Sequence, residues 1–310
     1  MSDPGDALSS AERERFETLR SVDSLAELVH VTGADTEHDA YFAGKREWRA
    51  LKEKLLPAAE RSDDHLPGDA VVVDGRRFVV HGVTHADTDA ERAHLREHVG
   101  EFLEDGAIVY CEQGIRSMYL SDVPDVRAMD DYRWALERCR ELAVDSHLSD
   151  GFDGLREDLT SVAGQFREAA YSLVHSGSDL YGEEFAAALG DVAADFLMSH
   201  EDVARAREFE AFALSRRAAE NPATLAELQR YYETAFLPMP LEREWLRRHD
   251  PELEVISHGR SERMADYAVY HGEADTVHLV VGAAHQLGTV YYLERHRDGH
   301  RRLEGFEVVA

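Results

Sequence analysis

The sequence predicts an α/β fold with a mixed, partly parallel central sheet built from the N- and C-terminal parts of the chain. Two β–α–β segments, one toward each end, predict parallel strands, because parallel neighbours need a long crossover connection. A long stretch with helical spacing lies between these segments and predicts a helical insert. Each end alone supplies too few strands for a stable sheet, so we expect the two ends to pair into one sheet.

The N-terminal region, residues 1–69, is predicted to be helical. Its apolar residues recur at helical spacing, which favours two or three amphipathic helices. These residues are Phe16, Leu19, Leu25, Leu28, Val29, Tyr41, Phe42, Trp48, Leu51, Leu55 and Leu56. A polar loop over residues 61–69 ends the region.

The first half of the sheet is predicted within residues 70–125. Two β-branched runs, 70–74 and 77–81, flank an Asp-Gly pair, the strongest short signal for a hairpin turn. A polar helix over 87–105 and a short buried strand over 107–112 follow. Strand, helix and strand together predict a β–α–β unit and hence a partly parallel sheet, with the 107–112 strand directly beside the 77–81 strand.

The helical insert is predicted at residues 126–250 and the second half of the sheet at 251–310. Apolar runs predict strands at 253–257, 277–282, 290–294 and 306–310, with a helix over about 260–271. We expect residues 70–310 to form one domain, since neither half of the sheet is complete alone.

The charge balance excludes several classes of partner. Asp and Glu number 62 against 34 Lys and Arg, which gives a formal net charge of −28. Nucleic acids and anionic membrane surfaces both need positive charge facing phosphate, so we expect neither as a partner. Of the basic residues only Lys45, Lys52 and Lys54 are lysines. An acidic, lysine-poor chain is typical of a halophilic protein, because concentrated salt screens its self-repulsion.

The sequence also predicts a cytoplasmic location. Its two cysteines, Cys111 and Cys139, are too few for a disulfide framework or a four-cysteine metal site. The N-terminal residues lack the features of a secretion signal, and no apolar run is long enough to span a membrane. The helical insert leaves a homo-oligomer open as a possibility.

Two segments share a local pattern in which a strand runs into Gly-x-x-His. The first is GVTH at Gly82–His85, and the second is GAAH at Gly282–His285. A glycine at the carboxyl end of a strand allows a sharp turn, and this end of an open α/β sheet is where ligands bind. Each histidine alone could be a loop residue bonded to the backbone. The pair predicts half of a divalent transition-metal site, which a carboxylate would complete.

Glu112 is the candidate carboxylate. It ends the predicted strand over 107–112, so its side chain should reach the same rim as His85. Arg116, four residues later, could hold Glu112 in place or stabilise negative charge on a substrate oxygen. The alternatives are a solvent-exposed glutamate and a surface salt bridge of small energetic value.

Taken together, these motifs resemble those of the TraB/PrgY family, which is related to the Tiki proteases and more distantly to the erythromycin esterases. The resemblance covers roughly residues 70–310, and it includes both Gly-x-x-His motifs and Tyr110-Cys111-Glu112. It also includes the segment RSERMA at Arg260–Ala265, which is similar to an Arg-rich family segment ending in Met-Ala.

The resemblance implies a metal-dependent hydrolase or peptidase that acts on a peptide or small-molecule substrate. In this hypothesis His85 and His285 bind Mn²⁺, Co²⁺ or Zn²⁺, and Glu112 either ligates the ion or serves as a general base. Arg116 and Arg260 neutralise an oxyanion. The alternative is a non-catalytic regulatory or ligand-binding protein that keeps the fold.

Several other histidine, glutamate and cysteine residues are expected to have structural and not functional roles. Glu91, His94 and His98 can share a face of the 87–105 helix, but that helix is polar throughout, so we expect a solvated face. His278 is expected to be a buried strand histidine bonded to its neighbours. Cys111 is expected to be a buried structural thiol, because strand alternation turns it away from the face of Glu112. Phosphate-binding loops, dinucleotide-binding glycine motifs and serine-nucleophile motifs are absent from the sequence.

Overall fold

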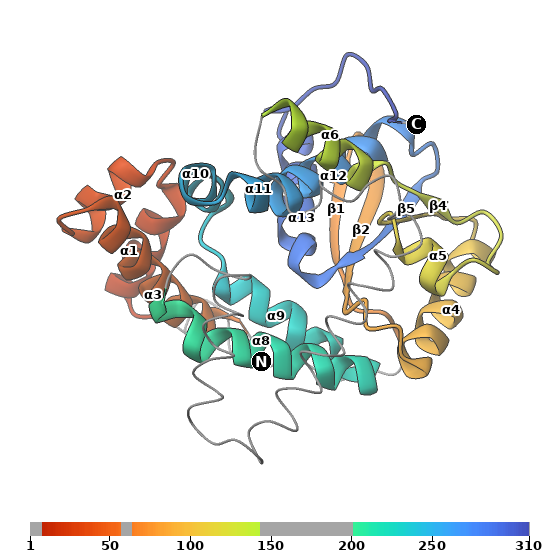
Figure 1. Cartoon of the computed structure of the whole chain (residues 1–310), viewed down its shortest axis with the longest axis horizontal. Coiled ribbons are helices and arrows are strands. Elements are labelled where there is room, and N and C mark those ends of the chain that lie inside the picture. The colour runs from red at the N-terminus through yellow and green to blue at the C-terminus, as the bar shows by residue number, and fades with distance from the viewer. Residues whose placement is uncertain (1–7, 57–63, 143–200, 310) are drawn as a thin grey trace. The chain divides into compact units, whose positions relative to one another are not determined.

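The computed structural model describes residues 8–56, 64–142 and 201–309 and confirms the predicted α/β fold (Figure 1). Its five-stranded mixed sheet has the order β1-β2-β5-β3-β4. The strands are β1 (Asp69–Val73), β2 (Arg76–Val83), β3 (Ile108–Cys111), β4 (Arg127–Ala128) and β5 (Thr276–Gly282). Only β1 is antiparallel to its neighbour. The N- and C-terminal parts of the chain therefore share one sheet, as the sequence predicts.

The hairpin of β1 and β2 turns at Asp74 and Gly75. Both residues have a positive φ, 50° and 81°. This backbone suits the right-handed twist of paired strands and explains why an Asp-Gly pair forms the turn. The predicted hairpin is confirmed.

The two strands that carry the Gly-x-x-His motifs are direct neighbours. β2 pairs with β5 in parallel over seven residues, with Gly82 opposite Val281 and Val83 opposite Gly282. β3 pairs with the other edge of β5. The expectation that β3 lies directly beside β2 is therefore wrong, because the C-terminal strand inserts between them.

Helices cover both faces of the sheet. On one face Leu279 packs with residues of α12 (Arg260–His271) and α13 (Ala283–Arg297). On the other, its neighbour Val280 packs with residues of α4 (Asp89–Glu104) and α5 (Ile115–Tyr119). Strand alternation thus separates two apolar cores and gives three layers.

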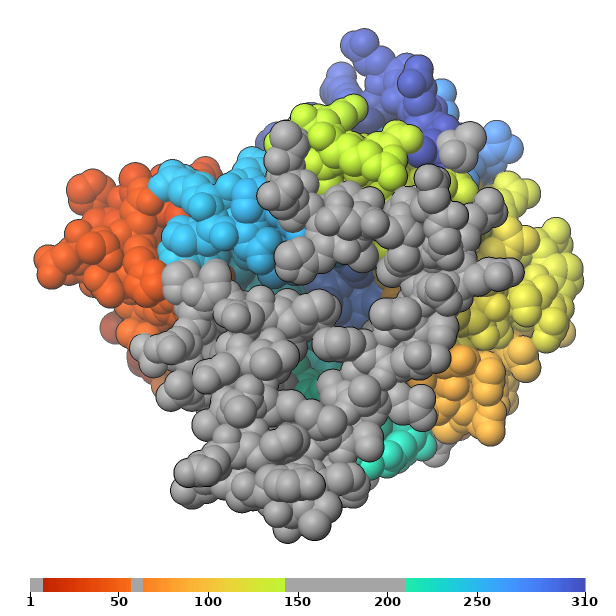
Figure 2. Space-filling view, in the orientation of Figure 1, coloured from red at the N-terminus to blue at the C-terminus, as the bar shows by residue number. Residues whose placement is uncertain are grey.

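The N-terminal helices form a separate apolar cluster with α10 (Met239–His249). These helices are α1 (Ser10–Ser21), α2 (Leu25–Thr32) and α3 (Glu37–Leu55). Tyr41 stacks on Trp245, and its hydroxyl donates to buried Glu242 at 2.7 Å. In the space-filling view the surface of these helices, in red, adjoins that of α10, in light blue (Figure 2).

The chain divides into two compact units, residues 1–138 with 214–310, and residues 139–213. The first unit contains the sheet and also α9 (Leu225–Ala235) and α11 (Pro251–Glu254). α6 (Asp131–Glu141) and α8 (Glu201–Glu220) each run from one unit into the other. Most of the predicted insert, residues 143–200, lies outside the described residues. None of the described helices has the length and apolar character needed to cross a bilayer.

Three predicted C-terminal strands are wrong. Residues 253–257 are helical, because Asp250 accepts a hydrogen bond from the Leu253 amide and Pro251 stands at the first helical position. Residues 290–294 belong to α13, whose buried residues recur at helical spacing on both sides of that short apolar run. The segment 306–309 forms no strand but lies against α12, with the Arg263 guanidinium over the Phe306 ring.

His278 is buried in β5, as expected, and it pairs with His81 of β2. The two rings stack, and His81 Nε2 lies 2.8 Å from His278 Nδ1. His278 also stacks on Phe102 of α4. Burial lowers the pKa of His81 to about 3 and that of His278 to about 4, so both rings are neutral in the folded protein.

This pair should make the fold acid-sensitive. Unfolded histidines take up protons below about pH 6.5, whereas the folded pair stays neutral to about pH 4. The free energy of unfolding should therefore fall as the pH is lowered from about 6.5 to about 4. Each histidine should contribute about 1.4 kcal/mol per pH unit. Urea titrations at fixed salt should show a shallower pH dependence for His278→Phe than for the wild type. The exposed-site control His300→Ala should keep the wild-type slope.

Candidate functional site

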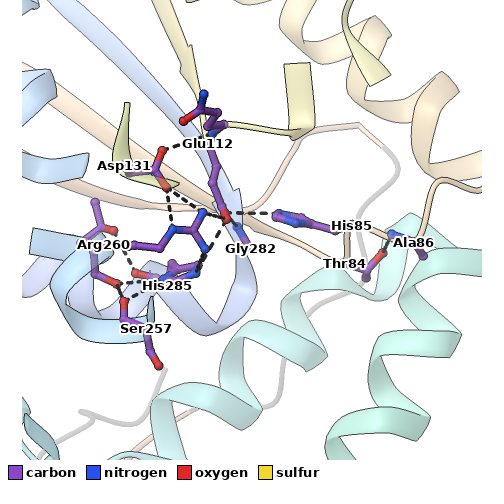
Figure 3. Close-up of polar contacts among 12 residues, drawn as sticks. Thr84, His85, Ala86, Glu112, Asp131, Ser257, Arg260, Gly282 and His285 are labelled. Carbon is purple, nitrogen blue, oxygen red and sulfur yellow. Dashed lines mark hydrogen bonds and ion pairs between the residues drawn. The ribbon is translucent and has the colours of Figure 1, made fainter. Parts of the chain in front are cut away.

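Four of the residues singled out from the sequence converge beyond the carboxyl ends of β2, β3 and β5 (Figure 3). His85 follows β2, Glu112 follows β3, His285 lies in the first turn of α13 after β5, and Arg260 begins α12. The parallel strands place these ends at one rim, which is where open α/β sheets bind ligands. We call these four residues the rim cluster.

The Glu112 carboxylate is the centre of the rim cluster. Its Oε1 accepts from Arg260 Nη2 and lies 3.8 Å from His285 Nε2. Its Oε2 accepts from the Gly282 amide at 2.8 Å and lies 3.4 Å from His85 Nε2. The side chain is nearly fully buried, so these contacts replace water around its charge.

Arg260 bridges two buried carboxylates. Besides Glu112 it contacts Asp131, whose Oδ2 accepts from Arg260 Nε at 2.8 Å and lies 2.6 Å from Nη2. The Asp131 Oδ1 accepts from the Gln113 amide at 3.2 Å. Asp131, the first residue of α6, did not emerge from the sequence as a site residue. Its only sequence signal is an acidic residue in the first turn of a helix.

His285 is oriented from behind by a π-helical turn at Val255–Gly259. Its Nδ1 lies 3.0 Å from the Ser257 carbonyl oxygen and 3.1 Å from Ser261 Oγ. A carbonyl oxygen can only accept, so Nδ1 carries the proton and Nε2 is left as an acceptor facing the cluster. Arg260 Nη1, 3.4 Å from that Nε2, donates toward it.

His85 has an unusual backbone conformation. Its φ is +58°, in the left-handed region that non-glycine residues seldom adopt. Its side chain is the most exposed of the four, at 22% of its full accessibility. His85 is therefore the member of the rim cluster that solvent reaches most readily.

The glycines that begin both motifs are explained by close packing. A Cβ on Gly82 would lie 2.3 Å from Gln286 Oε1 and 2.9 Å from the Ala283 Cα. A Cβ on Gly282 would lie 3.2 Å from His85 Nε2 and 3.5 Å from Glu112 Oε2. Gly82 therefore allows β2 to approach the start of α13, and Gly282 leaves room for the rim cluster itself.

Charges in the site are strongly coupled. Burial raises the pKa of Glu112, but Arg260, the two imidazoles and the Gly282 amide outweigh burial and hold that pKa well below its usual range. Burial and the negative charge of Glu112 raise the pKa of Asp131 to about 6. Burial lowers the pKa of His285 to about 4. Glu112 is therefore ionised and His285 neutral at pH 7.

The structure differs from the sequence predictions for Arg116 and for the burial of one face of α4. Arg116 is exposed on α5, and the guanidinium that holds Glu112 belongs to Arg260. The α4 face with Glu91 and His98 is not solvated, since both residues are buried, and only His94 is partly exposed. Cys111 is buried as expected, and burial raises the pKa of its thiol.

Comparison with protein-family models, curated proteins and solved structures found no match to this chain. Function must therefore be inferred from the rim cluster itself.

The two motif glycines should respond differently to alanine. Gly82→Ala forces a methyl group against the Ala283 backbone, so it should lower the free energy of unfolding by about 1–3 kcal/mol. Gly282→Ala should cost less, because the imidazole of His85 can shift. Gly100→Ala is the control, since its Cβ would meet nothing within 4 Å. Urea denaturation measures all three; equal stability of the Gly82 and Gly100 variants would contradict the close packing.

Proposed function

We propose that the rim cluster is the active site of a divalent-metal-dependent hydrolase, of the peptidase or esterase type that the TraB-like motifs imply. The single observation that carries this proposal is the position of two imidazoles around one buried carboxylate. His85 and His285 approach opposite oxygens of Glu112 at 3.4 and 3.8 Å, from the ends of adjacent parallel strands. Its substrate would be a peptide or a small molecule that reaches the strand ends.

The donor set suits a transition metal by type, and each imidazole lies near ligand-to-ligand distance from Glu112. Imidazole and carboxylate ligands lie about 2.0–2.2 Å from zinc, so two ligands at the tetrahedral angle are about 3.4 Å apart. The two separations at Glu112 are close to that value. The bond from His285 Nδ1 to the Ser257 carbonyl is also the outer contact that metal-binding histidines usually make. Mn²⁺, Co²⁺ and Zn²⁺ are the candidate ions.

Arg260 Nη2 donates to Oε1 of Glu112, the carboxylate that would help to hold such an ion. In the described part of the chain, no three His, Cys, Asp or Glu side chains are close enough together to hold a metal ion as they stand. Asp131 anchors Arg260 through Nε. The guanidinium can therefore leave Glu112 Oε1 and still keep a buried carboxylate partner.

Each residue then has a defined role. His85, Glu112 and His285 hold the ion, and Glu112 serves as a ligand because a carboxylate of depressed pKa is a weak base. A bound divalent ion would lower the pKa of water toward 7 and polarise a carbonyl oxygen. Arg260, once released from Oε1, would stabilise negative charge on a substrate oxygen. Arg116 is too exposed for that role.

A second candidate function is favoured by two contacts of Glu112. Glu112 is already satisfied by Arg260 on one oxygen and by the Gly282 amide on the other. Such a neutralised cluster also suits a non-catalytic regulatory protein that binds a peptide or small molecule at the strand ends. The two candidates differ in whether a metal can replace Arg260 at Glu112.

The composition supports a salt-rich cytoplasm as the working environment of this protein. The net charge of −28 and the scarcity of lysine are the supporting observations. We infer no nucleic-acid partner for the same reason.

Metal content tests the proposal directly. Protein purified in high salt without chelator or histidine tag should contain close to one Mn, Co or Zn ion per chain by elemental analysis. His85→Ala/His285→Ala should contain none, because two of three ligands are lost. The control His30→Ala/His300→Ala removes two exposed histidines and should keep the metal. A metal-free wild type that stays empty after metal is added would favour the non-catalytic candidate.

Replacement of Arg260 separates the two candidates by stability. Arg260→Met leaves two buried carboxylates without their cation, which should cost about 3–5 kcal/mol of unfolding free energy. Added Co²⁺ at 100 times its dissociation constant should restore about 2.7 kcal/mol if the rim cluster binds it.

The matched control is Arg243→Met, which breaks the buried pair with Glu254 away from the rim cluster. This variant should lose stability and gain no more from Co²⁺ than the wild type. If Co²⁺ fails to stabilise Arg260→Met while that variant remains folded, the metal site proposal is wrong.

A further inference from the structure

We propose that Glu91 is a positioning residue that clamps the Thr84–Ala86 backbone and so aims His85 at Glu112. That His85 binds a metal ion rests on the proposed function. The position of the His85 ring beside Glu112 is independent of that function. Glu91 lies in the first turn of α4 and is fully buried. The sequence alone placed it on a solvated helix face.

The hydrogen bonds of Glu91 enclose His85 on both sides. Glu91 Oε1 accepts from the Thr84 amide at 2.8 Å and from the Thr84 hydroxyl at 2.5 Å. Glu91 Oε2 accepts from the Ala86 amide at 2.9 Å. One carboxylate therefore fixes the amides of the residues immediately before and after His85, Thr84 and Ala86, which Figure 3 labels with His85.

The left-handed backbone of His85 explains why this loop needs to be held in place. A non-glycine residue at φ +58° is strained and persists only where its surroundings hold it. Asp87, at φ +55°, is held in the same way, because its amide donates to the buried Tyr119 hydroxyl at 2.5 Å. Side chains from α4 and α5 thus fix three amides of the loop that carries His85.

The chemistry of the clamp requires a carboxylate. Two amides and two hydroxyls, those of Thr84 and Tyr119, hydrogen-bond to it, so both oxygens must accept, and a glutamine offers one accepting oxygen only. A buried carboxylate is costly unless several donors satisfy it. The N-terminal turn of α4 also favours negative charge at this position. Glu91 also hydrogen-bonds the Tyr119 hydroxyl of α5, the same hydroxyl that accepts from the Asp87 amide, so this contact too supports the loop.

A merely structural role for Glu91 would stabilise the fold without setting the direction of the His85 ring. Ring direction can be followed separately from stability, by the NMR resonances of the His85 imidazole and by the Co²⁺ affinity of the rim cluster. Loss of an outer contact of a metal ligand typically lowers metal affinity by about 10–100-fold.

The experiment compares Glu91→Gln, Thr84→Val and Thr84→Ser with the wild type. Glu91→Gln should shift the His85 ring resonances and weaken Co²⁺ binding by about 10-fold or more. Thr84→Val removes one donor of the clamp and should show a smaller change in the same direction. Thr84→Ser keeps the hydroxyl and should match the wild type. If Glu91→Gln does not fold, the two Thr84 variants still test the clamp.

Glu254→Gln is the control, because Glu254 is a buried glutamate paired with Arg243 outside this loop. It should lose stability yet keep the His85 resonances and the Co²⁺ affinity. Wild-type resonances and affinity in Glu91→Gln or in Thr84→Val would overturn the proposal. A wild type that binds no Co²⁺ refutes the proposed function, whereas the resonances then decide the positioning role alone.

Discussion

The parallel pairing of β2 with β5 is the constraint on which the site depends. It joins strands from the two ends of the chain and sets Gly82 and Gly282 at adjacent register positions. The residues that follow, His85 and His285, then approach the same carboxylate. β3 pairs with the free edge of β5 and delivers that carboxylate, Glu112, from the other side. A one-residue slip of β5 would turn its side chains to the wrong faces.

Charge balance is the second constraint, since two carboxylates and one guanidinium are buried together. Burial raises the pKa of both Glu112 and Asp131 and their shared Arg260 lowers both, but the two imidazoles and the Gly282 amide lower only that of Glu112, whereas the charge of Glu112 raises that of Asp131. The trio carries a net negative charge while both carboxylates are ionised, and a divalent cation would reverse its sign. The same buried trio can therefore act as a resting state for a metal centre or as a permanent structural ion pair.

The sequence predicted the site residues that follow strands better than those that lie on helices. Both Gly-x-x-His motifs and Glu112 follow buried strands, so their shared rim followed from parallel topology alone. The insertion of β5 between β2 and β3 was not predictable, because a strand pattern does not encode its neighbour. Arg116 was a candidate through its short separation from Glu112, yet Arg260 makes the contact. Glu91 was assigned to a solvated helix face because its main partners, two loop amides and the Thr84 hydroxyl, leave no sequence signal.

Two departures from regular backbone geometry lie at the rim cluster. The backbone of His85 is in the left-handed region. Arg260 directly follows a π-helical turn, and the Ser257 carbonyl of that turn orients His285. π-Helical turns and strained residues both reduce stability and occur often at functional sites. Glu91 holds the left-handed backbone around His85, and the Ser257 carbonyl within the π-helical turn orients His285. A purely structural strand end would need neither, so the placement of this strain favours a site that binds or transforms a ligand.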